Sequence, residues 1–328
     1  MRAFSNVNAK DFKDAASLLK QNHDQGRTAA IVGGGSDLLG LVKEQLVPAD
    51  VLVNLRSIRG MDQVTEKNGE VIIGGLTTLD TLNHHPLIQS RYKVLAEAAG
   101  SVATPQIRNV GTIAGNVAQR PWCWYFRNGL PCFKNGGKTC FSVTGENDLH
   151  AIFGGGPSYI VHPSDTAPAL VALGAKFRII GPSAERTVAA EDFFTTPRVN
   201  PARENVLSND EILAEVHLPA PAKNTRSTYH KELDREAWTH AIVSVALVLE
   251  MDHQTCRSAR VVLGGVAPIP WRLKKVEALL AGQKITPELA AKAAETALEG
   301  AQPLSKNKYK VPLTKAIVRR NLIALANA

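Results

Sequence analysis

Three consecutive glycines that end an apolar run constrain the fold of this chain more than any other feature. The segment TAAIVGGG, which begins at residue 28, predicts a strand that runs into a tight turn. SDLLGLVKEQ then predicts a short helix, and ADVLVNL predicts a second strand that ends at Leu55. Strand, turn, helix and strand in this order form one compact α/β unit.

The turn itself, Val32 to Leu38, suits the binding of an anion. Its glycines leave no Cβ atoms between a ligand and the backbone N–H groups, and the helix that follows presents its positive end. The segment has neither the G-x-G-x-x-G spacing of dinucleotide-binding folds nor the lysine of a P-loop. A nucleotide-phosphate loop and a plain tight turn are therefore both open readings.

A second glycine segment, RNVGTIAGNVA at 108–118, supplies backbone donors, a hydroxyl and an amide within six residues. These groups belong to Gly111, Thr112, Gly115 and Asn116. Two separated donor loops suit an extended dinucleotide, whereas each loop alone is also explained as a turn that tolerates left-handed residues.

Further along, VHPSDTAPAL predicts a helix that begins at Ser164 or Asp165. Asp165 either caps this helix or accepts hydrogen bonds from ribose or ribityl hydroxyls, a role that carboxylates take in dinucleotide sites. We interpret the neighbouring His162 as a structural histidine.

The rest of the chain divides into two stretches. EVIIGG at 70–75, TTLDTLNHH and YKVLAEAAGSV predict a strand and two helices, and KFRII predicts a strand after the Asp165 helix. LPAPAKNTRS at 218–227 reads as a linker. Beyond it, STYHKEL, AIVSVALVLEM and SARVVLGGV predict an antiparallel sheet, with helices near 272–281, 287–299 and 313–326. We expect a separate α+β domain of about a hundred residues there.

Composition and charge exclude several classes of protein. A chain of 328 residues with 44% hydrophobic and 21% charged residues is expected to be soluble and globular. Its longest apolar run, at 241–251, is too short to span a bilayer, and the N-terminus lacks a secretory signal, so we expect a cytoplasmic protein. The net charge is +8, but the basic residues are scattered along the chain and no aromatic residues lie between them. This pattern disfavours binding to nucleic acid, and docking to an acidic partner surface explains the charge instead.

Four segments occur in one order along the chain: GGGSDLL, QIRNVGTIAGNVA, HPSD, and YHKELDREAW followed by VSVAL. Together they resemble the flavin-binding medium subunit of the molybdenum hydroxylases, the xanthine dehydrogenase and carbon monoxide dehydrogenase family. The resemblance implies an α+β fold: a two-lobed FAD-binding domain like that of the vanillyl-alcohol oxidase group, then a C-terminal α+β domain with an antiparallel sheet and helices. We expect the lobes at 1–56 and 57–222, and the C-terminal domain at 223–328.

The resemblance also implies which residues hold FAD. Backbone amides of two loops would hold the pyrophosphate, other polar side chains would hold phosphate or hydroxyl groups, and a lysine would lie near the isoalloxazine, where positive charge stabilises the reduced flavin. The first loop is Val32, Gly33, Gly34, Gly35, Ser36, Asp37 and Leu38, and the second loop contributes Gly111, Thr112 and Gly115. The polar side chains are those of Thr104, Asn109, Asn116 and Asp165, and the lysine is Lys231.

The segment PWCWYFRNGLPCFKNGGKTC contains three of the four cysteines. It resembles the insert by which one branch of the family, with 4-hydroxybenzoyl-CoA reductase and bacterial aldehyde oxidoreductases, ligates a [4Fe–4S] cluster. The resemblance implies a cysteine insert at 121–158 with Cys123, Cys132 and Cys140 as ligands, and the aromatic residues Trp122, Trp124, Tyr125 and Phe126 as a shield, a local core or a docking face.

The fourth cysteine of that branch is replaced here by Ser158. The open outcomes are a cluster with an oxygen, histidine or solvent ligand, a [3Fe–4S] cluster, or an insert without metal. Zinc with His150 or His162 is disfavoured because gaps of eight and seven residues separate the cysteines, and a disulfide requires export. Cys256 lies apart from this group and is interpreted as a bystander.

The resemblance thus implies an FAD-carrying electron-transfer subunit of an oxidoreductase. Its partners would be a large molybdopterin subunit, where substrate is hydroxylated, a small subunit with [2Fe–2S] clusters, and an external electron acceptor. A standalone flavin oxidoreductase of the vanillyl-alcohol oxidase type and a flavin-free scaffold are the alternatives. Export to the periplasm on a partner's signal is the alternative to the cytoplasm.

Overall fold

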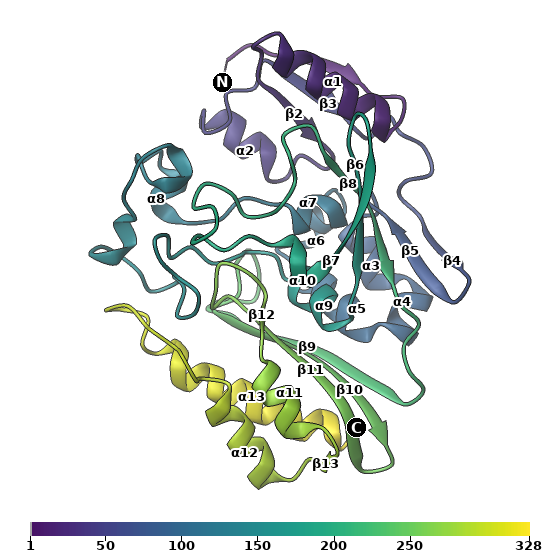
Figure 1. The fold of residues 1–328 in the computed structure, drawn as a ribbon, viewed down its shortest axis with the longest axis vertical. Helices are drawn as coiled ribbons and strands as arrows, with labels where there is room; N and C mark the ends of the chain where they lie inside the picture. The colour runs from purple at the N-terminus through teal and green to yellow at the C-terminus, as the bar shows by residue number, and fades with distance from the viewer. Residues whose placement is uncertain (1) are drawn as a thin grey trace.

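The computed structural model describes residues 2–328, and three sheets organise it (Figure 1). The first sheet is fully parallel, in the order β1 (Ser5–Asn8), β3 (Val51–Asn54), β2 (Ala29–Val32). Parallel neighbours need crossover connections, and α1 (Phe12–Asp24) and α2 (Leu38–Lys43) supply them. The expected strand, turn, helix and strand are therefore confirmed, while β1 and α1 extend the unit at its N-terminal end.

The second sheet is antiparallel and joins distant parts of the chain. Its order is β4 (Val64–Lys67), β5 (Glu70–Gly74), β8 (Ile212–Leu218), β6 (Lys176–Ile180), β7 (Glu185–Ala189). The segments between these strands form short helices: α3 (Leu79–His84), α4 (Pro86–Arg91), α5 (Lys93–Gly100), α6 (Pro105–Arg108), α7 (Ile113–Val117), α9 (Thr166–Ala172) and α10 (Ala190–Phe193).

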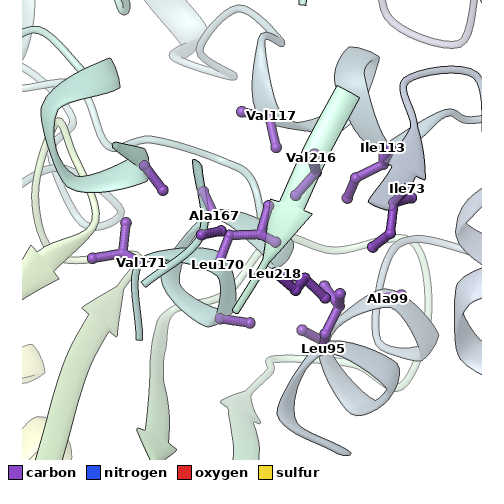
Figure 2. Close-up of a cluster of buried hydrophobic side chains, with 14 of the residues drawn as sticks. Ile73, Leu95, Ala99, Ile113, Val117, Ala167, Leu170, Val171, Val216 and Leu218 are labelled. Atoms are coloured by element: carbon purple, nitrogen blue, oxygen red, sulfur yellow. The ribbon is translucent and has the colours of Figure 1, made fainter. Parts of the chain in front are cut away.

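Apolar side chains of these helices cover one face of the second sheet. Figure 2 shows Leu95 of α5, Ile113 of α7 and Leu170 of α9 directed toward Val216 and Leu218 of β8. All five are essentially buried. This core fixes α7, and with it the second glycine segment, on the sheet.

The third sheet forms the C-terminal part and confirms the expected antiparallel arrangement. It runs β12 (Trp271–Arg272), β11 (Thr255–Gly264), β10 (Val243–Asp252), β9 (Thr225–Glu232), and β13 (Gln283–Lys284) also pairs with β11. Three helices follow: α11 (Lys274–Leu280), α12 (Pro287–Thr296) and α13 (Lys310–Ala326).

Both faces of the third sheet are covered. The C-terminal helices pack on one face, and α5 and α9 pack on the other. Glu97 of α5 strengthens this junction because its carboxylate accepts hydrogen bonds from the backbone N–H of Tyr229 at 2.7 Å and the hydroxyl of Thr228 at 2.9 Å. The loop 219–224 connects β8 to β9 inside the expected linker.

The cysteine insert follows α7 in the chain and contains little regular structure. It holds α8 (Trp124–Arg127), η1 (Phe133–Asn135) and η2 (Phe141–Val143). Its C-terminal end is fastened to the C-terminal part: Asn147 accepts from Lys306 N at 2.8 Å, and Asn307 Nδ2 donates to His150 O at 3.0 Å. Among residues 2–328, no helix combines the length and apolarity needed to cross a membrane.

Lys310, the first residue of α13, is fully buried without a carboxylate partner in the described part of the chain. Its Nζ donates to the carbonyl oxygens of Gly265 at 2.7 Å and Leu149 at 3.0 Å. Burial penalises the ammonium form and lowers the pKa of Lys310 to about 7. The folded state therefore binds fewer protons than the unfolded state between pH 7 and 10.5.

Because of this difference, the free energy of unfolding should rise with pH across that window. Lys310→Met should remove up to ~5 kcal/mol of the rise, at about 1.36 kcal/mol per pKa unit. Urea unfolding at several pH values measures this, with the exposed Lys308→Met as a matched control. Parallel pH curves for Lys310→Met and the wild type would contradict the assignment.

Candidate cofactor-binding site

A cavity of about 980 Å³ lies where the first lobe, the second lobe, the insert and the loop before β10 meet. This volume is at the upper end of the roughly 300–1,000 Å³ of ligand pockets. The cavity is lined by stretches of 33–38, 111–120, 146–150 and 234–242, among others. Segments far apart in the sequence therefore share one concave surface.

The two glycine segments are in direct contact inside this cavity. A Cβ atom placed on Gly34 would lie 1.9 Å from the carbonyl oxygen of Val110, a distance that no side chain tolerates. Gly35 has a φ of +73°, in the left-handed region that glycine occupies without strain. The two glycine segments thus converge on a common space. The expectation of backbone donors in the second segment is wrong for its glycines, because Gly111 N–H donates to Ile107 O at 2.7 Å and Gly115 N–H to Thr112 Oγ1 at 3.2 Å.

Backbone donors of the first glycine turn are available to a ligand. Within the described residues, the N–H groups from Gly33 to Asp37 donate no hydrogen bond to other protein groups. Ser36 is exposed and the other residues of the turn are half-buried, so a ligand can reach these N–H groups. Successive N–H groups in a glycine turn form a concave anion site. The turn therefore fits an anionic group such as a diphosphate.

Asn116 fixes the second glycine segment to the start of α9. Its Oδ1 accepts hydrogen bonds from Ser164 Oγ at 2.6 Å and from Thr166 Oγ1 at 2.7 Å. Ser164 also caps α9, because its Oγ accepts from the N–H of Ala167 at 3.0 Å. The side chain of Asn116 is thus held in one orientation at the cavity wall.

Asp165 lies beside the cavity in a buried group of polar side chains. Its Oδ1 accepts from Tyr229 Oη at 2.7 Å, and its Oδ2 from Lys231 Nζ at 2.8 Å. Burial, together with the charge of Asp165, raises the pKa of Tyr229 well above its usual range. Lys231 Nζ also donates to Ser101 O and Thr239 O, each at 3.1 Å, so the lysine neutralises a buried carboxylate.

Most of the sequence-predicted cofactor residues line the cavity. These are Gly33, Gly34, Gly35, Ser36, Asp37, Leu38, Gly111, Thr112, Gly115, Asn116 and Asp165. Four lie outside its lining: Val32, Thr104, Asn109 and Lys231. Thr104 caps α6 through the N–H of Ile107 at 3.4 Å, and Asn109 donates to Pro105 O at 2.8 Å. The cofactor roles of all fifteen stay predictions.

Sequence reasoning did not assign Trp238 or His240 to the site, yet both line the cavity. They come from the loop between β9 and β10. Trp238 lies in YHKELDREAW, a segment used for the resemblance, so the available signal was an aromatic residue close to the predicted flavin lysine.

The three cysteines of the insert lie near one another but have different immediate polar neighbours. Cys123 Sγ lies 3.4 Å from His150 Nε2, Cys140 Sγ lies 3.1 Å from Ser142 Oγ, and Cys132 packs in an apolar cluster. All are free thiols, and burial raises the pKa of Cys123. Ser158 is buried.

Residues 2–328 contain no group of three or more His, Cys, Asp or Glu side chains arranged to hold a metal ion. As placed, the thiols therefore do not form a ligand set for a metal centre. Burial lowers the pKa of His150 to about 4 and that of His162 to about 3, so both imidazoles are neutral.

An ion pair connects the cysteine insert to the first glycine turn. Arg127 Nη2 of α8 lies 2.7 Å from Asp37 Oδ1, and the N–H of Arg120 donates to Asp37 Oδ2 at 3.0 Å. Arg127 is fixed further by hydrogen bonds to Arg120 O at 3.0 Å and Pro121 O at 2.9 Å. Asp37 consequently makes no capping bond to α2 and instead holds the insert against the turn.

Comparison with known families gives two matches that together span nearly the whole chain. The family described as FAD binding domain in molybdopterin dehydrogenase matches residues 2–221, and the CO dehydrogenase flavoprotein C-terminal domain matches residues 228–325.

Individual relatives agree with these matches. The chain is 33% identical to the aldehyde oxidoreductase FAD-binding subunit PaoB of Escherichia coli K12. The match extends over 293 residues and covers 88% of each chain. It is 28% identical to the carbon monoxide dehydrogenase medium chain of Hydrogenophaga pseudoflava, over 96% of this chain and 94% of that one. The crystal structure of the cyanide-inactivated Cu,Mo-CO dehydrogenase superposes with a TM-score of 0.78 at 25% identity, covering 99% and 98%.

Removal of the Asp37–Arg127 ion pair tests whether the insert positions the glycine turn. Arg127→Met leaves a half-buried carboxylate unpaired beside the anion site, so the dissociation constant for FAD should rise roughly five- to hundredfold, the equivalent of about 1–3 kcal/mol. Titration of the flavin-free chain with FAD measures it. Arg91→Met, which removes a 2.7 Å ion pair to Glu66 elsewhere, is the matched control. Equal affinity in the two variants would refute the positioning role.

Proposed function

The chain belongs to the family of FAD-binding medium subunits of the molybdenum hydroxylases, and from this premise we propose that it binds FAD in the cavity between the glycine turns and carries electrons through it. The observation that carries the proposal is the contact of Gly34 with Val110, which brings both glycine segments to one space. The chain is accordingly an oxidoreductase subunit.

The proposal assigns a role to each group of residues. N–H groups from Gly33 to Asp37 hold the diphosphate, and Asn116 and Asp165, which also line the cavity, hold phosphate or hydroxyl groups. When bound, FAD supplies reversible electron uptake and release. Lys231 keeps its proposed place toward the isoalloxazine, with its 2.8 Å contact to Asp165 as the link to the cavity wall.

The partners follow from the relatives, whose names describe subunits and medium chains of larger enzymes. We assign substrate hydroxylation to a large molybdopterin subunit, electron delivery to a small [2Fe–2S] subunit, and electron exit to an external acceptor. The division into 1–56, 57–222 and 223–328, with a vanillyl-alcohol-oxidase-type arrangement of the first two, is part of the same proposal. The parallel sheet of the first lobe and the two antiparallel sheets support it.

A finer part of the proposal concerns the cysteine insert. We assign it an iron–sulfur cluster, [4Fe–4S], with Cys123, Cys132 and Cys140 as ligands and Ser158 as the fourth. Its support is the donor chemistry of three free thiols in one short insert. The thiols do not form a ligand set as placed, so no electron-transfer step is assigned to this cluster.

The purified chain should show a flavin absorption spectrum with about one FAD per chain. Gly34→Ala should abolish FAD binding, because the added Cβ meets the Val110 carbonyl oxygen at 1.9 Å. Gly40→Ala is the matched control, since its Cβ would have no neighbour within 4 Å. Circular dichroism of both variants separates loss of FAD from loss of fold. A flavin-free wild type, or bleaching of its flavin by an added substrate alone, would overturn the subunit role.

Iron and acid-labile sulfide analysis tests the cluster, with electron paramagnetic resonance of the reduced protein. We expect iron and sulfide in the wild type, their loss in Cys132→Ser, and their retention in Cys256→Ser, because Cys256 is buried in the third sheet. Comparison of Ser158→Ala with His150→Ala distinguishes the fourth ligand. A wild-type chain without iron after anaerobic purification would refute the cluster.

A further inference from the structure

A group of three charged side chains at the cavity wall contains two cations and one carboxylate. Glu204, in the loop after α10, lies 2.9 Å through Oε2 from Arg120 Nε and 2.8 Å through Oε1 from Lys134 Nζ. The side chains of Glu204 and Lys134 are 5% and 1% exposed. We call these three residues the Glu204 cluster. A charge that is removed from water without a counter-charge is costly, so the second cation of the cluster calls for a further anion.

Asp37, a carboxylate beside the Glu204 cluster, does not balance the extra charge. It accepts the backbone N–H of Arg120 at 3.0 Å, so it lies next to this residue. Asp37 already pairs with Arg127 at 2.7 Å, and these two side chains together carry no net charge. Three cations and two carboxylates therefore meet here, with a net charge of +1.

Other groups near the Glu204 cluster add no negative charge. Burial and the charge of Lys134 lower the pKa of His162 to about 3, so its imidazole is neutral. Arg203 precedes Glu204 in the chain and is itself a cation, whose guanidinium donates to the loop 207–209. Burial lowers the pKa of Lys134, but the carboxylate of Glu204 favours its ammonium form. The surroundings of the cluster are therefore electropositive.

Most other carboxylates of the cavity lining have a cation of their own. These pairs are Glu146 with Lys306, Asp165 with Lys231 and Glu211 with Arg186. The other charged residues of the lining are Asp148, Asp234 and Arg235. Burial and the charges of Asp148 and Asp234 raise the pKa of Tyr309, so both carboxylates lie near the start of α13. The excess positive charge is thus found at the wall that the Glu204 cluster forms.

Arg120 is the member of the Glu204 cluster that faces the cavity. It lines the cavity with a side chain that is 29% exposed, whereas Glu204 and Lys134 are not part of the lining. The guanidinium lies 4.8 Å from the centre of the Phe126 ring, which fixes its plane. Its Nη2 is buried and has no hydrogen-bond partner within residues 2–328. A fixed guanidinium with unused donors suits the oxygens of phosphate groups.

We propose that Arg120 binds the diphosphate of FAD and supplies the counter-charge that this anion requires. The bond from its backbone N–H to Asp37 places Arg120 beside the first glycine turn, whose free N–H groups extend from Gly33 to Asp37. The turn offers backbone dipoles, and Arg120 adds a full positive charge, which makes its hydrogen bonds to an anion stronger. Arg120 thereby selects a dinucleotide over an uncharged flavin such as riboflavin. This role rests on the proposed function.

Arg120→Met tests the role. Lys134 still neutralises Glu204 in this variant, so we expect it to fold, and circular dichroism checks this. The FAD-free full chain is titrated by calorimetry with FAD and, separately, with ADP, which has the diphosphate but no flavin. The substitution should raise both dissociation constants by a similar factor of roughly ten or more, which corresponds to about 1.4 kcal/mol per tenfold.

Two further variants complete the comparison. Arg120→Lys keeps the charge and should weaken both ligands less than Arg120→Met does. If Arg120→Met does not fold, a parallel loss of FAD and ADP affinity in Arg120→Lys supports the same role. Arg178→Met is the matched control, because the Arg178 side chain is 34% exposed and pairs with Glu215 at 2.8 Å outside the cavity lining. It should leave both dissociation constants unchanged.

The outcomes distinguish this proposal from the proposed function. Unchanged affinity of Arg120→Met for both ligands would overturn the role of Arg120. A loss of affinity for FAD alone would overturn it as well, because the arginine would then act on the flavin half or on the fold. A wild-type chain that binds ADP through Arg120 but does not bind FAD would refute the proposed function and support the anion site. A wild-type chain that binds FAD but not ADP would refute the anion site alone.

Discussion

The close approach of Gly34 to the Val110 carbonyl is the constraint on which the rest of the site depends. It allows the turn after β2 and the loop between α6 and α7 to meet without intervening side chains. The contact brings the free N–H groups of the first turn and the fixed side chain of Asn116 into the lining of one cavity. A single methyl group at this position would separate the lobes.

Charge is arranged around the cavity in buried or half-buried pairs. Lys231 neutralises Asp165, Arg127 neutralises Asp37, and Glu204 receives both Arg120 at 2.9 Å and Lys134 at 2.8 Å. A buried charge without a partner is strongly destabilising, so each pair fixes the relative position of two segments. The insert is thereby joined to the first lobe through Arg127 and to the loop after α10 through Lys134.

The parts of this structure that were predictable have local causes. The β2–turn–α2–β3 unit follows from apolar periodicity and three glycines, and the third sheet follows from alternating residues with a linker before it. The pairing of β5 with β8 was not predictable, because about 140 residues separate these strands and no local pattern specifies partners. The same reason explains why Asp165 and Lys231 were each assigned to FAD although they bind one another across 66 residues. Likewise, nothing local to Cys123 indicates that His150 is its neighbour.

The cysteine insert also has a mechanical consequence. Asn147 and His150 are bonded to Lys306 and Asn307, and Glu97 is bonded to β9, so several cross-links besides the 219–224 loop connect the two halves of the chain. Cleavage of that loop by a protease would leave a nicked but associated protein. The two fragments are expected to copurify and, when coexpressed as separate polypeptides, to reassemble as a split protein.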